Sequence, residues 1–422
     1  MRRNGMESTT RILPAAVYCR LRERSAVAWC EFGRDYHVVA ALSAVPCGSR
    51  AELEHTLRQV LHGVHVAPQL WRATARGRRE HATLGHAPRL PAAMGWLGYE
   101  AGSWFERMPS PVAARSLPDA WWGLVTEYAL FDHEDQLLGM SSRLCDETFV
   151  PSSPSVPPRT GARRAPAAGA SYQSGVRTIL KHLRAGDCYQ VNLARQVVVD
   201  TPGDPLHAWL RLRTTNPARR AMLIETPYGA IVSNSPELLL SVRGTALLSV
   251  PIKGTSPLAE PSGRLLRSPK ERAELTMIVD LVRSDLGRVA TPGSVRAGPR
   301  RVGRVGHVHH AMQRVYATLA EGKDAVDALA AIFPPGSVTG APKVRAMEII
   351  RNLERVPRGV YCGALGWVGS EALELNVAIR TITFAHGVAT IPVGAGIVIG
   401  SDPEREFAET ELKAARMLEA LC

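Results

Sequence analysis

Paired glutamates stand out in two segments with helical spacing. Glu406, Glu409 and Lys413 occupy positions i, i+3 and i+7, which lie on one face of a helix. Glu271 and Glu274 have the same i, i+3 spacing near the start of an earlier helical pattern. Carboxylate oxygens suit Mg²⁺, so two such helix faces would hold this cation if they faced each other. The alternative is that each face is simply exposed to solvent and that Glu271 belongs to a capping box.

Lysine is scarce in this chain, which has 6 lysines beside 45 arginines. An amine, unlike a guanidinium, can lose its proton and attack carbon. Lys253 ends an apolar run in the segment PIKGT, where partial burial would lower its pKa and make it a nucleophile. Glu237 precedes the apolar run LLLSV and would be a general acid if burial raised its pKa. The alternatives are a strand-end lysine that reaches solvent and an ordinary turn glutamate.

Two glycine-rich segments could present backbone N–H groups to a carboxylate. The segment GSVTGAPK, residues 336–343, is not a P-loop, because Pro342 stands where the second loop glycine belongs and no Gly-Lys-Ser/Thr follows. The segment VGAG, residues 393–396, follows a strand but opens no helix at once, so it is a weak dinucleotide signal. Arg380 is a candidate bidentate partner for the same anion, whereas His310 alone is more typical of a core histidine.

The elements that must position these residues are mixed. Helical patterns are expected over residues 172–186 and 268–287, from Pro342, and from Asp402-Pro403. Strand-like runs such as QVNLARQVVV, IVSNSPELLLSV, ALELNVAIRTITF and VATIPVGAGIVIG come in hairpin-like groups between the helices. This order predicts an α+β fold with largely antiparallel sheets sandwiched by helices. The five prolines of residues 151–170 predict a linker between an N-terminal part, 1–150, and a part that carries the chemistry, 171–422.

Composition excludes several classes of protein. With 45% hydrophobic and 21% charged residues, the chain has enough apolar side chains for a large core. No apolar run approaches the roughly 20 residues of a membrane span, and no signal peptide is recognisable, so a cytoplasmic protein is expected. The net charge of +12 comes from arginines spread along the chain, without the patterns of a nucleic-acid-binding protein. Seven scattered cysteines indicate neither a disulfide framework nor a zinc site.

In order along the chain, these segments resemble the chorismate-utilising enzymes, a family that includes anthranilate synthase component I, aminodeoxychorismate synthase component I, isochorismate synthase and salicylate synthase. The resemblance covers most of residues 171–422 and includes GDCYQVNLARQ, SNSPELLL, PIKGTSP, ERAELTMIVDLVRSDLGR, FPPGSVTGAPKVRAMEII, GALGW, LNVAIRT, GAGIV and SDPEREFAETELKA. GWLGYEAGSWFE, residues 95–106, is similar to a stretch in the N-terminal part of the two amino-transferring members. The resemblance implies the component I fold and chorismate as the substrate.

The resemblance also implies roles for individual residues. Mg²⁺ would bind the ring carboxylate of chorismate through Glu274 and Glu409, with Glu271 and Glu406 in supporting positions. Glu237 matches the acid that helps the C4 hydroxyl leave, and Lys253 matches the nucleophile. The residues that match contacts to the substrate and its carboxylates are Arg380, Lys413, His310, Thr339, Gly340, Gly394, Ala395 and Gly396.

Two positions distinguish the reactions of the family. Members that add water have a lysine base where this chain has Gln190, and an amide cannot deprotonate water. Anthranilate synthases have alanine where this chain has Lys253, whereas aminodeoxychorismate synthases have lysine. A lysine allows two displacements, in which Lys253 attacks C2 with loss of the C4 hydroxyl and ammonia then attacks C4. The expected product is 4-amino-4-deoxychorismate, the precursor of p-aminobenzoate.

Two alternatives remain. Anthranilate synthase component I belongs to the same family. A non-catalytic chorismate-binding or amidotransferase-docking subunit is suggested by Trp367 and Ser284, where the family usually has Tyr and Asn; Gln313, where Ser is typical, is a third departure from the family pattern. No segment of the chain resembles a glutaminase with its nucleophilic cysteine, so ammonia is expected from a separate glutamine amidotransferase subunit.

Overall fold

The computed structural model describes residues 12–32, 36–45, 47–73, 79–81, 90–108, 116–146, 149, 169–200, 203–306 and 308–421. Within these residues, none of the helices has both the length and the apolar character needed to cross a membrane. The helices are α1 Pro14–Arg22, α2 Arg50–Leu61, α3 Gly169–Arg184, α4 Pro205–Thr215, α5 Gly263–Arg267, α6 Pro269–Gly287, α7 Ala325–Ile332, α8 Gly336–Thr339, α9 Lys343–Leu353 and α10 Pro403–Glu419, with two 3₁₀ segments at Tyr99–Trp104 and Ser142–Asp146.

Helices α6 and α10 begin where local capping predicts. Ser268 accepts a hydrogen bond from the backbone N–H of Glu271 at 3.3 Å, and Pro269 occupies the first position of α6. Asp402 caps α10 in the same way, with Pro403 in its first position. The four predicted helices correspond to α3, α6, α9 and α10. These predictions are therefore confirmed, because caps and apolar spacing are local properties of the sequence.

All the strand pairs of the described residues are antiparallel, and they form two half-sheets. Half-sheet A runs β16–β8–β20–β19–β10–β9–β1–β2, and half-sheet B runs β5–β17–β18–β11–β12–β15, with β13 and β14 both paired to β15. Strand β6 pairs with β2 and with β5 and so joins the two. The strands are β1 Ala26–Phe32, β2 Tyr36–Val45, β3 Leu70–Ala73, β4 Arg79–His81, β5 Ala93–Leu97, β6 Ala120–Asp132, β7 Leu137–Ser141, β8 Gln190–Asp200, β9 Met222–Thr226, β10 Gly229–Ser233, β11 Leu238–Arg243, β12 Ala246–Val250, β13 Ile252–Pro257, β14 Arg296–Val305, β15 Val308–Thr318, β16 Gly340–Ala341, β17 Ala364–Gly369, β18 Ala372–Val377, β19 Thr381–Ala385 and β20 Val388–Ile397.

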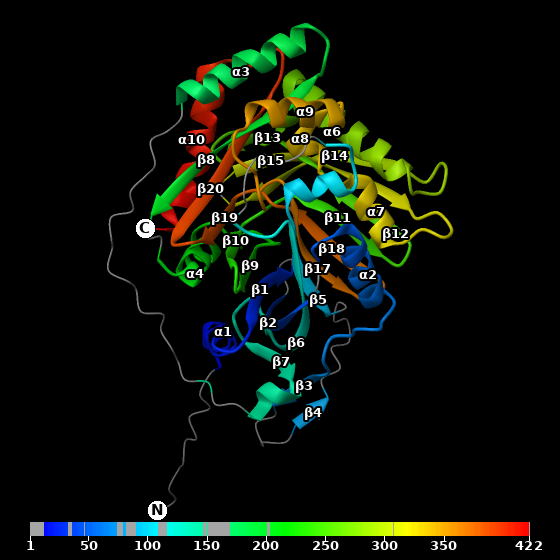
Figure 1. Ribbon diagram of the computed structural model, residues 1–422, viewed down its shortest axis with the longest axis vertical. Coiled ribbons are helices and arrows are strands. Elements are labelled where there is room, and N and C mark those ends of the chain that lie inside the picture. Colours follow the sequence, from blue (N-terminus) through cyan, green and yellow to red (C-terminus); the bar gives the residue numbers. More distant parts are fainter. Residues whose placement is uncertain are drawn as a thin grey trace, which may run out of the picture.

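Three hydrophobic clusters hold these layers together. One cluster lies between the half-sheets and includes Trp96, Trp121, Ile224 and Leu365. The second packs α2, α3, α6, α7 and α9 against half-sheet B and the site end of half-sheet A, and the third packs α1, α4 and α10 against half-sheet A. Figure 1 shows α3, α6, α8, α9 and α10 at one end of the molecule, beside β8, β13, β15 and β20. The predicted α+β fold, with antiparallel sheets between helices, is confirmed.

Two predicted strands are each divided in the structure. The run IVSNSPELLLSV was expected as one strand, but it forms β10 in half-sheet A and β11 in half-sheet B; ALELNVAIRTITF likewise forms β18 in half-sheet B and β19 in half-sheet A. The breaks are neighbours, because the N–H of Asn234 donates to Arg380 O at 2.9 Å and the N–H of Val377 donates to Glu237 O at 3.1 Å. Arg380 has a φ of 51° at this point. The half-sheets therefore diverge where Glu237 and Arg380 lie.

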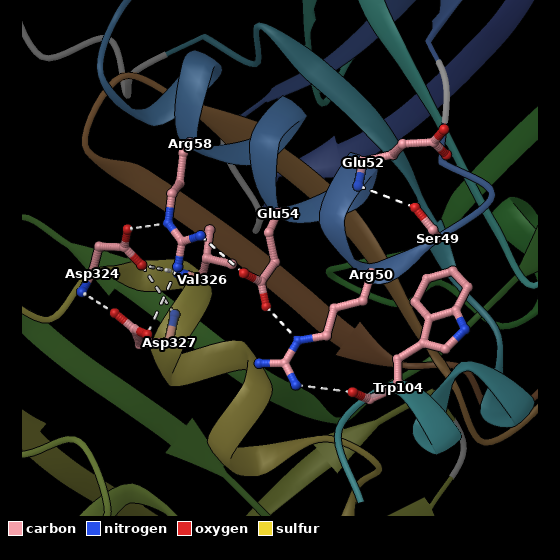
Figure 2. A network of polar contacts seen from close by, with 9 residues as sticks. All are labelled: Ser49, Arg50, Glu52, Glu54, Arg58, Trp104, Asp324, Val326 and Asp327. Carbon is pink, nitrogen blue, oxygen red and sulfur yellow. Dashed lines mark hydrogen bonds and ion pairs between the residues drawn. The ribbon is translucent and has the colours of Figure 1, made fainter.

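Strands from the two ends of the chain are interleaved. Strand β1 pairs with β9, and β5 pairs with β17. Helix α2 also reaches α7, where Arg58 donates to Asp324 at 2.8 Å and contacts Glu54 at 2.9 Å (Figure 2). The division into parts 1–150 and 171–422 stays a prediction. Of the predicted linker, residues 151–168 lie outside the described residues, and α3 begins at Gly169.

Candidate active site

A β-bulge in half-sheet B positions Lys253 toward Gly396 of half-sheet A. The register of β13 against β15 shifts between Lys253 and Thr255. Gly254, inside the shift, has a φ of 72°, a left-handed conformation that favours glycine. A Cβ on Gly254 would collide with Oε2 of Glu271, so helix α6 packs directly onto the bulge. The positive φ therefore favours glycine after Lys253, and a Cβ there would also make the Glu271 side chain move.

The side chain of Lys253 comes from half-sheet B, and its amine lies against half-sheet A. A Cβ on Gly396 of β20 would lie 3.2 Å from Nζ of Lys253 and 3.3 Å from Nε2 of Gln190. Burial lowers the pKa of Lys253, while the nearby carboxylates of Glu274 and Glu237 partly oppose this shift. A lowered pKa increases the fraction of neutral amine, which is the nucleophilic form.

Glu237 is a buried acid beside this amine. Its residue is 4% exposed, and burial raises its pKa to about 7, against the opposing effects of a hydrogen bond from Ser337, the charge of Lys253 and the N–H of Ile252. Near neutral pH a large fraction of Glu237 is therefore protonated. Such a group can donate a proton to a leaving oxygen. An amine with a lowered pKa and a carboxyl with a raised pKa therefore lie close enough to influence each other.

Gln190 is a buried amide with unused hydrogen-bonding capacity. It is 0% exposed, and neither Nε2 nor Oε1 has a hydrogen-bond partner among the described residues. Its backbone carbonyl lies against Gly340, where a Cβ would collide with it. A buried amide without partners costs free energy, which is typical of a group that meets a ligand.

Four glutamates from two helices interact with one another near the amine, and Glu274 and Glu409 act on it directly. Burial raises the pKa of Glu274 on α6, and Glu271 and Glu409 raise it further. On α10, burial also raises the pKa of Glu406. Burial acts in the same direction on Glu409, but Lys413, 2.7 Å away, outweighs it and leaves that pKa lowered. The four carboxylates thus belong to one electrostatic cluster.

The donor set of this cluster fits a hard cation. Its ligand atoms are all carboxylate oxygens, and mutual repulsion raises the pKa of Glu274. A divalent cation would relieve that repulsion. In the described part of the chain, however, no three potential ligands are already gathered around one point. The chemistry of the glutamates therefore fits a hard cation, although their present arrangement is not that of an assembled metal site.

Arg195 sets the orientation of α10. Its Nε donates to Thr410 at 2.8 Å, its Nη2 contacts Glu411, and its guanidinium lies 4.8 Å from the centre of the Phe407 ring. Thr410 lies one turn after Glu406 on α10, and Phe407 and Glu411 lie beside it. Because Arg195 belongs to β8, the strand that begins with Gln190, it holds the glutamates in register with the site.

The sequence matches the model of the chorismate binding enzyme family over residues 40–419. The chain belongs to this family. Aminodeoxychorismate synthase component 1 of Klebsiella aerogenes is 38% identical over 356 residues, covering 80% of this chain and 78% of the relative. Anthranilate synthase component 1 of Streptomyces coelicolor is 36% identical over 383 residues, covering 80% and 75%. The protein is therefore a chorismate-utilising enzyme with relatives of both kinds at similar identity.

Solved structures agree with this assignment. Anthranilate synthase component I of Streptococcus pneumoniae matches with a TM-score of 0.73 at 26% identity, covering 93% of this chain and 90% of that chain. An isochorismate synthase of Bacillus anthracis matches with a TM-score of 0.70 at 20% identity, covering 96% and 99%, and shows the same fold.

Several of the other predicted chorismate contacts are occupied by protein partners. Nη2 of Arg380 lies 2.7 Å from Nε2 of His310, so Arg380 donates to the imidazole. Burial, helped by Arg380, lowers the pKa of His310 to about 4, so its ring is neutral. Nζ of Lys413 donates to Gly394 O at 2.9 Å, and the Thr339 hydroxyl donates to Pro335 O at 2.9 Å. A substrate carboxylate would thus replace existing contacts of Arg380 and Lys413.

The residues of the rejected P-loop pattern have structural roles. Nζ of Lys343 lies 2.7 Å from Asp285 and is buried, so it is not available to a phosphate. Ser337 is buried and donates to Glu237, a role that the sequence did not indicate. Arg358 and Glu354, a buried ion pair after α9, were also not anticipated. Ser337 could have been suspected from its glycine-rich loop, whereas no local signal marks Arg358.

The three departures from the family pattern lie in different surroundings. Trp367 is buried between the half-sheets. The centre of its ring lies 5.5 Å from that of Phe32, and the guanidinium of Arg243 lies over its face. Ser284 is exposed on α6. Gln313 donates to Gly298 O at 2.9 Å and ties β14 to β15.

Proposed function

We propose that this enzyme is aminodeoxychorismate synthase component I, which converts chorismate and ammonia to 4-amino-4-deoxychorismate. The observation that carries the proposal is the position of Lys253, whose amine lies at Gly396 with a lowered pKa and a buried acid, Glu237, beside it. An enzyme that only activates ammonia has no need of a second amine at this point.

The reaction takes two balanced steps. Neutral Nζ of Lys253 forms a bond to C2, the ring double bonds shift, and the C4–O bond breaks. Glu237 supplies the proton with which the C4 oxygen leaves as water. Ammonia then forms a bond to C4, the double bonds shift back, and the C2–N bond to Lys253 breaks. The amine and the acid return to their starting states after one ammonium proton reaches Glu237.

The remaining residues bind and orient the substrate. Glu274 and Glu409 would hold Mg²⁺, with Glu271 and Glu406 in support, and the cation when bound would neutralise the ring carboxylate. Arg380, Lys413 and the backbone at Gly394–Gly396 and Thr339–Gly340 would contact the carboxylates. Gln190 has no basic atom, which disfavours the addition of water.

Ammonia would come from a glutamine amidotransferase partner. Relatives named component 1 imply a second component. A cytoplasmic location accords with this role.

The second candidate is anthranilate synthase component I, since relatives of that name are equally similar. Incubation of the purified chain with chorismate, Mg²⁺ and ammonium, followed by mass spectrometry, distinguishes the two products. Lys253→Ala should abolish product, and Lys323→Ala, a change at an exposed lysine before α7, should not. Withholding ammonia should leave a covalent adduct on Lys253. Anthranilate as the main product, or full activity of Lys253→Ala, would refute the proposal, and chorismate binding without turnover would indicate a non-catalytic subunit.

A further inference from the structure

A buried arginine lies behind the substrate-binding loop, outside the groups that react. The side chain of Arg358 is 2% exposed and that of its partner Glu354 is 8% exposed. Nε and Nη2 of Arg358 donate to the two carboxylate oxygens of Glu354 at 2.8 and 2.7 Å. The guanidinium also lies 4.6 Å from the centre of the Tyr99 ring. The cation is thus fixed in one orientation by a bidentate pair and an aromatic ring.

The other donors of Arg358 hold two carbonyls that belong to the walls of the site. Nη1 donates to Val338 O at 2.8 Å, and Nη2 donates to Asn192 O at 2.7 Å. Val338 directly precedes Thr339 and Gly340 in the chain. Asn192 lies opposite Gly396 in the β8–β20 pair, two residues after Gln190. One guanidinium therefore joins the predicted anion-binding loop to the strand beside the Lys253 amine.

Two further contacts fix the backbone around this arginine. The carboxylate of Glu100, which is buried, accepts hydrogen bonds from the N–H groups of Arg358 at 2.8 Å and Gly359 at 2.9 Å. Glu354 also accepts from the N–H of Ala194 on β8 at 2.8 Å. The cation cannot shift without displacing groups from α8, from Glu354 after α9, from β8 and from the 3₁₀ segment Tyr99–Trp104.

Stability alone is a weak explanation for this arrangement. A buried ion pair commonly contributes no more than apolar side chains of similar volume, because both charges lose their hydration. Its geometry, in contrast, is demanding. Arg358 makes four hydrogen bonds in the plane of its guanidinium, which a lysine ammonium cannot reproduce.

We propose that Arg358 is a positioning residue for chorismate binding: by holding Val338 O and Asn192 O, it sets the backbone of Thr339 and Gly340 against the strand that carries Gln190. The inference rests on the proposed contact between this loop and a substrate carboxylate. It does not depend on which product the enzyme forms.

The test compares Arg358→Lys with a matched control, Arg58→Lys. Arg58 likewise joins two elements through carboxylates, but it does so between α2 and α7 (Figure 2). Chorismate affinity is measured by calorimetry with Mg²⁺ present, KM and kcat by product formation, and stability by thermal melting. Arg358→Lys should weaken chorismate binding and raise KM by about tenfold, the effect of one misaligned hydrogen bond to a charged group, with kcat changed less than about threefold. Arg58→Lys should leave both affinity and KM unchanged.

A second variant covers the case in which Arg358→Lys does not fold. Glu354→Gln keeps the carbonyl contacts of Arg358 but removes its counter-charge, and it should raise KM by a smaller factor. If either folded variant melts at a lower temperature but binds chorismate with unchanged affinity, the arginine is only structural and the inference is wrong. If anthranilate is formed but Arg358→Lys still weakens chorismate binding, the inference stands and the proposed product is wrong.

Discussion

Replacing Glu237 by Gln should change stability and activity in opposite directions. Glu237 is 4% exposed, and burial raises its pKa from 4.5 to about 7. A carboxyl whose pKa is raised on folding favours the folded state fully below pH 4.5, and this favourable contribution is lost as the pH rises through 7. Above pH 7 the folded protein therefore carries a buried carboxylate that destabilises it. The glutamine has the same shape and no charge.

The magnitude follows from the shift in pKa. At pH 8, Glu237 lowers the free energy of unfolding by about 3 kcal/mol relative to a carboxyl with an unshifted pKa, and at pH 5 it lowers this free energy by about 1 kcal/mol. The difference of about 2 kcal/mol corresponds to about 2–3 °C in melting temperature for a chain of 422 residues. Glu237→Gln should therefore raise the melting temperature at pH 8 and have little effect at pH 5.

The assay is thermal melting of both proteins between pH 5 and 8, together with kcat/KM over the same range. Glu419→Gln changes an exposed carboxylate of α10 and is the control. Its difference in melting temperature from the unsubstituted enzyme should be the same at pH 5 and pH 8. In the unsubstituted enzyme, kcat/KM should decline above about pH 7 as Glu237 ionises, and it should fall at low pH as Lys253 becomes protonated. Glu237→Gln should lose at least about 10²-fold in kcat, the range of a general acid.

Two results would refute this reasoning. If Glu237→Gln is equally destabilised at pH 5 and pH 8, the carboxyl does not carry a buried charge. If the variant retains kcat, the leaving hydroxyl receives its proton from another group, and the pairing of Glu237 with Lys253 has no catalytic role.

Three further changes test the construction of the site. Gly254→Ala should destabilise by about 1–2 kcal/mol through its positive φ and should lower kcat/KM, because the bulge that positions Lys253 would shift and Glu271 would have to move. Gly244→Ala, with a φ of 57° and open space around it, should lower only the melting temperature. Glu274→Gln should raise the Mg²⁺ concentration for half-maximal activity by about tenfold without lowering the melting temperature, and an unchanged Mg²⁺ titration would remove Glu274 from the ligand set. Arg195→Met should raise the Mg²⁺ concentration for half-maximal activity by a few-fold, because α10 loses a contact that orients it, and the KM for chorismate should stay constant. A change in KM alone would contradict this role of Arg195.

The sequence predicted the helices well and the strands less well. Helices α6 and α10 begin at Ser268-Pro269 and Asp402-Pro403 because capping depends only on neighbouring residues. The breaks between β10 and β11 and between β18 and β19 were missed, since nothing local marks the point at which a strand changes sheets. The long apolar runs are buried on either side of the break, so they read as continuous strands.

The same contrast holds within the site. Lys253 and Glu237 could be selected from the sequence, because a lone lysine beside glycine and an acid before an apolar strand are local features. Their proximity to Gly396 and Gln190 could not, because β13 and β20 belong to different half-sheets. Arg358 was missed for a related reason, since its partners come from three separate segments.

The site is divided between two half-sheets that share one hydrophobic cluster. Lys253 and Glu237 come from half-sheet B, whereas Gln190 and Gly396 come from half-sheet A. Val191 and Ala395, beside Gln190 and Gly396, belong to the same cluster as Leu239 of β11, so packing couples the two half-sheets at the site. Under the proposed function, an amine at 253 makes covalent attack at C2 available, and an amide at 190 removes the base that water would need. The two side chains that this function makes responsible for the choice of nucleophile therefore come from strands that meet only in the folded protein.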